Sequence, residues 1–144
     1  MENMTDLEIA VQNLDGHSIC LCKNGELIIN DGRGISPMMQ LIAENKDLNG
    51  YSAADIIVGK ATAILFVKAG ITCVHGRTMS ESGRAYLESH GIPCTYDILT
   101  ERIINRKGTD ICPMEKAVAD IEDTETGYEA LRKRVEEMRT ERTE

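Results

Sequence analysis

The chain has 144 residues, a length typical of one domain, which disfavours a two-domain enzyme with a cleft between its domains. Its hydrophobic share of 42% and charged share of 28% are ordinary globular values and argue against wholesale disorder or a membrane-embedded bundle. The chain carries 16 Lys and Arg against 24 Asp and Glu, and this formal charge of -8 repels polyanions, so nucleic acid is an unfavourable partner.

The 5 cysteines form an odd, scattered set without the spacing of a secreted disulfide framework. Residues 1–14 carry acids and amides instead of a basic start followed by an apolar block, so we expect no signal peptide. No window approaches the roughly 20 apolar residues that span a bilayer. We therefore expect a soluble cytoplasmic protein with reduced thiols and no membrane partner.

The first part of the chain predicts a helix and a hairpin. Thr5-Asp6-Leu7-Glu8 has the spacing of a capping box and predicts a short helix to about Asp15. Two β-rich runs follow, at 18–23 and 26–30. Because Asn24-Gly25 between them tolerates the positive φ angles of a type I′ turn, we expect a β-hairpin.

Two further helices are expected in the middle of the chain. Ser36-Pro37 predicts an N-cap followed by proline at the first helical position, opening a helix through about Lys46. Residues 59–69 are apolar almost all round, which is typical of a helix buried on most sides. Gly70 is placed to end this central helix.

A strand at 71–75, a helix at 80–90 and a strand at 93–98 come next, separated by short turns. This succession favours parallel neighbours joined by a right-handed crossover. Together these elements predict an α/β fold: a three-layer α/β/α sandwich around a mixed sheet of about five strands.

The last part of the chain predicts a polar loop, a helix that begins at Cys112-Pro113, and a charged terminal helix. We expect one domain over residues 1–123 and a separate helical segment over 124–144. The terminal helix carries a narrow heptad-like seam, which predicts either docking on its own domain or a homodimer contact. The seam consists of Tyr128, Leu131, Val135 and Met138.

Gly59-Lys60 at a predicted helix start indicates an anion site, because free N–H groups and a lysine together hold oxyanions. The segment is not a phosphate loop, since Ala54 replaces the early glycine and Ala61 replaces the magnesium-binding Ser or Thr. We expect the Lys60 head group to be partly exposed. The alternatives are a helix start that uses glycine for close packing, and pairing of Lys60 with Asp55.

The chain lacks the spacing of a metal site. His17, His75 and His90 are isolated, and the only close cysteine pair, Cys20-Leu21-Cys22, is more typical of a buried strand. There is also no GxSxG elbow for a nucleophilic serine. We expect no metal and no cofactor.

Cys112 precedes Pro113 and is therefore expected at a helix N-cap, where the helix dipole and unpaired N–H groups favour the thiolate. Glu115, three residues on, is the reciprocal partner in a capping arrangement and would oppose that effect. Cys112 is either a structural cap or a reactive or ligand-binding thiol.

Five segments together carry a family resemblance: Gly34-Ile35-Ser36-Pro37, Val58-Gly59-Lys60-Ala61, Gly76 with Met79-Ser80, Ile104-Asn105-Arg106 and Cys112-Pro113-Met114-Glu115. They resemble the bacterial and archaeal domain-of-unknown-function family 1893 (DUF1893), over about residues 6–121. The resemblance implies a cytidine deaminase-like fold, which agrees with the order of elements predicted above.

In zinc deaminases the metal lies between two helix starts that supply a His or Cys, a general-acid/base Glu and a Pro-Cys-x-x-Cys pair. Here the first start reads Gly59-Lys60-Ala61-Thr62, without a zinc donor or a carboxylate. The second start has Ser80 and Gly83 where the cysteines would stand. The resemblance therefore implies a deaminase scaffold without the zinc chemistry, while other enzymatic activity stays open.

Three functions compete. The first is binding of a small anionic ligand, a nucleotide among the candidates, by residues at and near the two helix starts. The second is an enzyme or modification acceptor with Cys112 as nucleophile and a charged partner nearby. The third is an oligomeric interaction module that uses the C-terminal seam. The predicted ligand-binding residues are Gly59, Lys60, Ser80, Arg106 and Glu115, with Arg77 as a weaker candidate.

Overall fold

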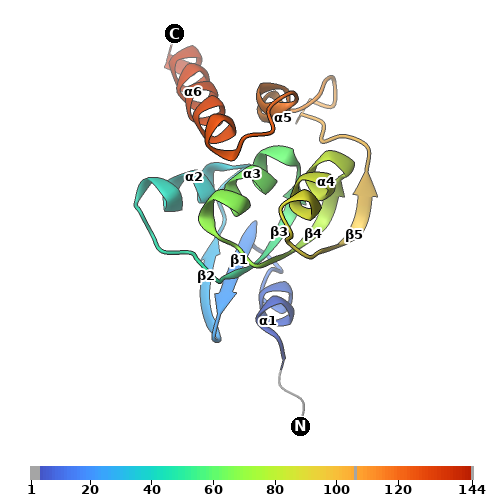
Figure 1. Cartoon of the computed structure of the whole chain (residues 1–144). Helices are drawn as coiled ribbons and strands as arrows, with labels where there is room; N and C mark the ends of the chain where they lie inside the picture. The colour runs from blue at the N-terminus through green and yellow to red at the C-terminus, as the bar shows by residue number, and fades with distance from the viewer. Residues whose placement is uncertain (1–3, 106, 144) are drawn as a thin grey trace.

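The computed structural model describes residues 4–105 and 107–143. Its elements follow one another as α1 (Asp6–Gln12), β1 (Ile19–Lys23), β2 (Glu26–Asn30), α2 (Ser36–Ala43), β3 (Ser52–Val58), α3 (Lys60–Ala69), β4 (Cys73–Ser80), α4 (Glu81–Ser89), β5 (Cys94–Thr100), α5 (Pro113–Val118) and α6 (Thr124–Thr143) (Figure 1).

The strands form one mixed sheet in the order β2-β1-β3-β4-β5. β1 runs antiparallel to both β2 and β3, whereas β3, β4 and β5 are parallel. The prediction of an α/β protein with a mixed five-stranded sheet is confirmed. The central strand β3 lies in a segment to which the sequence analysis assigned no element.

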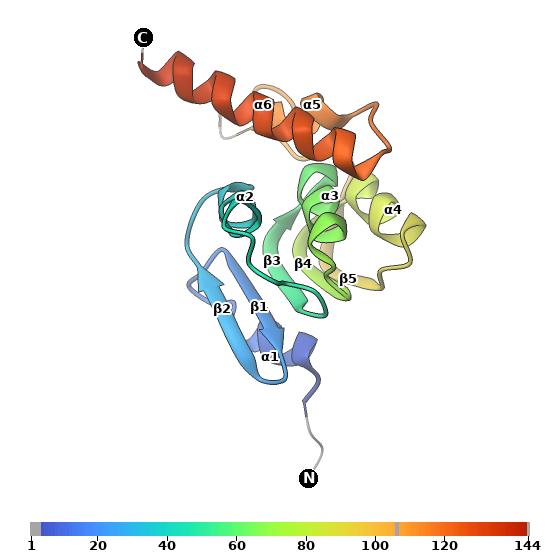
Figure 2. The ribbon, with the colours of Figure 1, turned by 60° about the vertical axis from the view of Figure 1, so that its left-hand side comes forward.

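Helices lie on both faces of the sheet. On one face Ala10 of α1 and Leu14, just after it, pack against Cys20 and Cys22 of β1. On the other face α3 contributes a fully buried run, residues 63–66, to the main core. α2 and α4 lie beside α3, and α5 and α6 lie across this helical layer on its outer side (Figure 2). None of the described helices is long and apolar enough to cross a membrane.

Local sequence signals account for several elements. Thr5 caps α1 as predicted: its Oγ1 accepts the N–H of Glu8 at 3.1 Å, and the Glu8 carboxylate accepts the N–H of Thr5 at 3.0 Å. Asn24 and Gly25 have φ angles of 52° and 82°, which make the predicted turn between β1 and β2. Gly70 adopts the left-handed conformation that ends α3, as expected.

Other boundaries differ from the predictions. Ser36 is the first residue of α2 and not its N-cap, because its hydroxyl donates back to the carbonyl of Arg33 at 2.9 Å. The N-cap position belongs to Ile35, and α2 ends at Ala43. β4 extends to Ser80, well past the predicted strand end, since its C-terminal residues pair with both β3 and β5.

The helix α6 packs on the main core through its N-terminal half. Leu131 is fully buried, and Tyr128 and Val135 are partly buried against the same cluster. Gly127 lies so close to α3 that a Cβ there would stand 2.9 Å from the Cδ1 of Ile64. These seam residues contact their own domain, and a homodimer contact stays a prediction.

Asp55 is a buried carboxyl in the middle of the sheet. It is 6% exposed and pairs with Ile19 of β1 on one side and Gly76 of β4 on the other. Burial raises the pKa of Asp55 to about 7, although hydrogen bonds from the backbone N–H groups of Ile57, at 3.1 Å, and Ile56 act in the opposite direction. The folded protein therefore holds a proton on Asp55 that the unfolded chain releases at lower pH.

This shift predicts a stability that falls as the pH rises. Because the folded pKa of about 7 exceeds the ordinary value of 3.8, the contribution is complete below 3.8 and is lost as the pH rises through 7. The loss is at most about 4 kcal/mol of unfolding free energy. Asp55→Asn should abolish this component and be more stable than the parent at pH 8.

Urea denaturation of the parent and the variant at pH 5 and pH 8 measures the effect. Glu26→Gln, which neutralises an exposed carboxylate on β2, is the matched control and should leave the pH slope unchanged. A parent and an Asp55→Asn variant with the same pH slope would show that the Asp55 carboxyl is not held protonated.

Candidate functional site

Two helix starts meet at the carboxyl ends of β3 and β4. α3 begins after Gly59 and α4 after Ser80, and Gly83 in the first turn of α4 faces the start of α3. A Cβ on Gly83 would lie 2.9 Å from both the carbonyl oxygen of Val58 and the carbonyl carbon of Gly59. The predicted convergence of the two helix starts is present, but it leaves no room for a side chain between their backbones.

The start of α3 binds a carboxylate from the protein's own chain. One oxygen of Glu115 on α5 accepts the N–H of Lys60, and the other accepts the N–H of Ala61, each at 2.8 Å. A Cβ on Gly59 would overlap the Glu115 carboxylate, so glycine is needed for this approach. The helix start therefore acts as an anion-binding position, and Glu115 occupies it.

Lys60 is buried beside this carboxylate, with an exposure of 6%. Its Nζ donates to the carbonyl oxygen of Ala119 at 3.1 Å and lies 3.2 Å from a carboxylate oxygen of Glu122. The expectation of a partly exposed Lys60 head group is wrong, because residues after α5 cover it. The ion-pair partner of Lys60 is Glu122 and not the predicted alternative, Asp55.

The hydroxyl of Tyr86 on α4 binds the chain between α5 and α6, which also contacts Lys60. It donates to the carbonyl oxygen of Glu122 at 3.0 Å and lies 2.6 Å from the Oγ1 of Thr124. Burial raises the pKa of Tyr86 above its ordinary value. α3 and α4 thus both hold the connection between α5 and α6, which lies over their N-terminal ends in Figure 1.

Ser80 and Arg77, two further predicted ligand-binding residues, have other partners. Ser80 is fully buried and caps α4, where its Oγ accepts the N–H of Gly83 at 3.0 Å. Arg77 pairs with Asp15, which follows α1. Arg106 lies outside the described residues. Of the predicted set, the structure brings together Gly59, Lys60 and Glu115.

Cys112 stands at the N-cap position of α5, directly before Pro113, as predicted. Its side chain makes no capping hydrogen bond, and the reciprocal capping role proposed for Glu115 is wrong, because the Glu115 carboxylate is bound to α3. The backbone N–H of Cys112 donates to the carbonyl of Ile103 at 2.9 Å. Cys112 is partly exposed.

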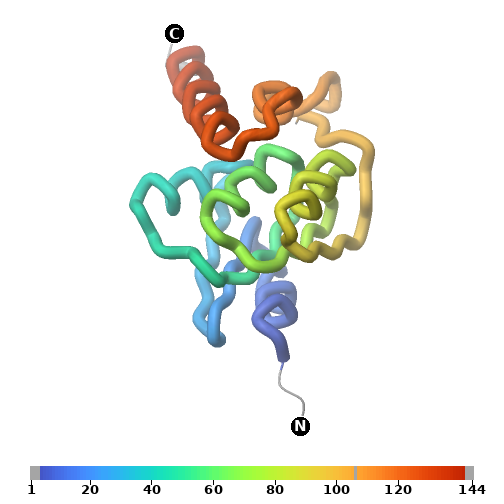
Figure 3. Tube along the Cα trace, viewed as in Figure 1, coloured from blue at the N-terminus to red at the C-terminus, as the bar shows by residue number. Residues whose placement is uncertain are grey.

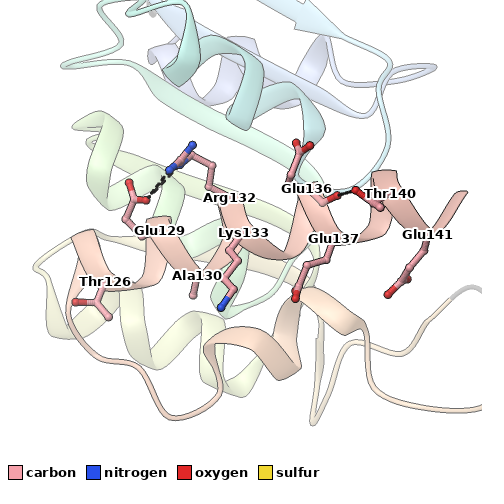
Figure 4. Close-up of a pocket in the computed structure, with 9 residues that line it drawn as sticks. All are labelled: Thr126, Glu129, Ala130, Arg132, Lys133, Glu136, Glu137, Thr140 and Glu141. Carbon is pink, nitrogen blue, oxygen red and sulfur yellow. Dashed lines mark hydrogen bonds and ion pairs between the residues drawn. The ribbon is translucent and has the colours of Figure 1, made fainter. Parts of the chain in front are cut away.

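A shallow hollow along α6 is not a second site (Figure 4). Within it the guanidinium of Arg132 pairs with Glu129 at 3.1 Å. Because only one helix lines the hollow, it does not enclose a ligand. Its lining residues are Thr126, Glu129, Ala130, Arg132, Lys133, Glu136, Glu137, Thr140 and Glu141. Across the described part of the chain, no three His, Cys, Asp or Glu side chains gather in a group that could hold a metal ion.

A family model described as a domain of unknown function, DUF1893, matches residues 10–135. The chain belongs to the DUF1893 family. The crystal structure of a DUF1893 family protein from Thermotoga maritima matches with a TM-score of 0.80 and 22% identity, over 94% of this chain and 92% of that chain. At this identity the likeness shows a shared fold. A search of curated proteins finds no match.

These comparisons confirm the family resemblance and go no further than the family and its fold. Sequence reasoning missed Tyr86, Ala119 and Glu122. No local sequence pattern predicts the contact between Lys60 and the backbone carbonyl of Ala119. Outside the start of α3, Glu115 is the one residue of this cluster that the sequence indicated, through the segment after Cys112 that resembles DUF1893.

The tight approach of Glu115 to Gly59 predicts non-additive mutations. Gly59→Ala should cost about 2 kcal/mol of unfolding free energy, because the new Cβ displaces the carboxylate. In a Glu115→Ala background the same substitution should cost less than about 1 kcal/mol. Chemical denaturation of the two single variants and the double variant measures the coupling.

Gly83→Ala is the matched control. Its Cβ would meet backbone atoms of Val58 and Gly59 instead of a flexible side chain, so removing Glu115 should not rescue it. Equal costs of Gly59→Ala in both backgrounds would contradict the proposed contact.

The cysteines should differ in reactivity. Burial raises the pKa of the Cys20, Cys22 and Cys94 thiols, which slows their alkylation near neutral pH. Cys112 lies partly exposed at a helix start, so limited iodoacetamide labelling with peptide mapping should find it modified before Cys94. Labelling that begins at Cys94, or that reaches Cys112 only on unfolding, would remove Cys112 from consideration as a reactive thiol.

Proposed function

We propose that this DUF1893 protein binds a small molecule that carries a carboxylate or phosphate group, at the start of α3, in exchange for Glu115. The observation that carries the proposal is the pair of 2.8 Å hydrogen bonds from the N–H groups of Lys60 and Ala61 to the two Glu115 oxygens. Successive helix N–H groups that each bind one oxygen of an anion are a recurrent means of holding phosphates and carboxylates.

The charges around this position favour an anion. α3 is a ten-residue helix whose first turn contains no acidic residue, so its positive end is not offset by its own side chains. The ammonium group of Lys60, the first residue of α3, adds a positive charge at this helix start. When the Glu122 carboxylate no longer binds it, the ammonium group of Lys60 becomes a further donor for a phosphate. This donor set fits a nucleotide as the ligand class.

A free ligand has to compete with a carboxylate that is tethered to the chain. Tethering gives Glu115 a high effective concentration at the start of α3, so weak anions cannot replace it in the parent protein. Binding therefore requires either a ligand with more contacts than one carboxylate or a change that withdraws Glu115.

The proposed function does not include zinc-dependent deamination, because the sequence of neither helix start contains the metal donors that this chemistry uses. A nucleophilic role for Cys112 has less support than ligand binding. The charged partners it would need, Glu115 and Lys60, are bound to α3 and to residues after α5. The cluster thus favours recognition over covalent chemistry.

Chemical rescue tests the anion position directly. Glu115→Ala removes the carboxylate and leaves two N–H groups facing a space of its size, so the variant should lose about 2 kcal/mol of stability. Sodium acetate at about 50 to 200 mM should restore part of this loss, measured as a rise in Tm over sodium chloride at equal ionic strength.

Two controls make the result specific. Glu81→Ala removes an acidic residue from the first turn of α4 and should show no acetate-specific rise in Tm. The double variant Gly59→Ala with Glu115→Ala should also lose the rescue, since the Cβ fills the space. An equal effect of acetate and chloride on Glu115→Ala would reject the proposed function.

A further inference from the structure

We propose that residues 113–122, the covering segment, form a releasable cover over the start of α3 that Glu115 holds closed. The covering segment comprises α5 and the connection toward α6 (Figure 3). Only the nature of what replaces Glu115 rests on the proposed function. The mobility of the cover is a separate property and can be measured without any ligand.

The polar anchors of the covering segment converge on one place. Glu115 binds the N–H groups of Lys60 and Ala61, and Ala119 and Glu122 bind the Lys60 ammonium group. Both ends of the segment therefore contact the first residue of α3, and the hydroxyl of Tyr86 on α4 also donates to the carbonyl of Glu122. Loss of the Glu115 contact removes the only charge-assisted pair of hydrogen bonds that the described residues of α5 make to α3.

Apolar packing adds little to this attachment. Val118 is the one fully buried residue of α5, and Met114 is partly buried against the main core. The Lys116 ammonium group pairs with exposed Asp110, in the loop before α5. A helix of six residues is also too short to be stable alone. Such a segment belongs to the part of a fold that opens locally at low free-energy cost.

The chain on either side is fixed independently of the cover. Before it, Ile104 forms an antiparallel bridge with Ile111. After it, a carboxylate oxygen of Asp123 accepts both the N–H and the hydroxyl of Thr126, at 2.9 and 2.6 Å. Buried Leu131 then anchors α6. The covering segment can therefore move while α6 stays docked.

Opening has a specific chemical consequence. When the covering segment leaves, the ammonium group of Lys60 loses the carbonyl of Ala119 and the carboxylate of Glu122, and the N–H groups of Lys60 and Ala61 lose Glu115. Release of the cover thus unmasks three donors together. A phosphate, with more oxygens and more charge than a carboxylate, matches that set best.

Hydrogen exchange on the ligand-free protein tests the cover. Peptides spanning the covering segment should exchange about tenfold faster or more in Glu115→Ala than in the parent, because charge-assisted bonds are lost. Peptides from residues 128–138 of α6 should be unchanged. Lys116→Ala is the matched control, because it places alanine in the same helix but removes only an exposed ion pair. Its covering segment should exchange at the rate of the parent.

A second variant and a phosphate titration separate the outcomes. Glu115→Gln keeps the side-chain shape and one acceptor oxygen, and should exchange at an intermediate rate. Unchanged exchange in the segment, or a rise that extends equally to α3 and α6, would overturn the cover. If Glu115→Ala loosens the segment while inorganic phosphate does not raise the Tm of that variant above its value in sodium chloride at equal ionic strength, the cover stands and the proposed anion binding fails.

Discussion

The attachment of α5 to the rest of the protein depends on one carboxylate at one helix start. Glu115 joins α5 to the first turn of the central helix, 55 residues earlier in the chain. Unpaired N–H groups at a buried helix start are costly, and α3 has no side-chain cap of its own, because Gly59 occupies the N-cap position. The structure satisfies these donors from a distant segment instead.

The binding of Glu115 to these N–H groups explains the local sequence around the start of α3. Gly59 leaves space for the carboxylate, and Gly83 allows the start of α4 to pack against the carbonyl groups that precede α3. Lys60 would be an unfavourable buried charge without the carbonyl of Ala119 and the carboxylate of Glu122. The identities of Gly59 and Lys60 are explained only when the covering segment is in place, which links the stability of the fold to the state of the site.

Sequence reasoning worked where a local pattern decides the structure. The capping box at Thr5, the turn at Asn24-Gly25 and the apolar α3 are each set by interactions within a few residues. β3 gave no such pattern, because its first half has small or polar residues, with the buried carboxyl of Asp55 among them, in place of an alternating or β-branched run. Its pairing with β1 and β4 decides its structure.

In the candidate site, too, some features follow from the local sequence and others depend on contacts between distant residues. The identification of Gly59 and Lys60 as an anion position followed from a general property of helix starts, and the structure places an anion there. That the anion is Glu115, and that Lys60 is buried, depends on contacts between residues 54 to 62 positions apart. Ser80 was grouped with them because both helix starts were expected to line one pocket, whereas its hydroxyl is used as the cap of α4.

The most direct measurement follows the two backbone amides themselves. In ¹⁵N-labelled Glu115→Ala, the central claim predicts that the amide protons of Lys60 and Ala61 shift progressively on addition of acetate or phosphate, as their hydrogen bonds are restored. The amides of α6 should stay in place. Shifts that are absent at Lys60 and Ala61, or that are spread evenly over the surface, would contradict the claim that the start of α3 is an anion-binding position held by Glu115.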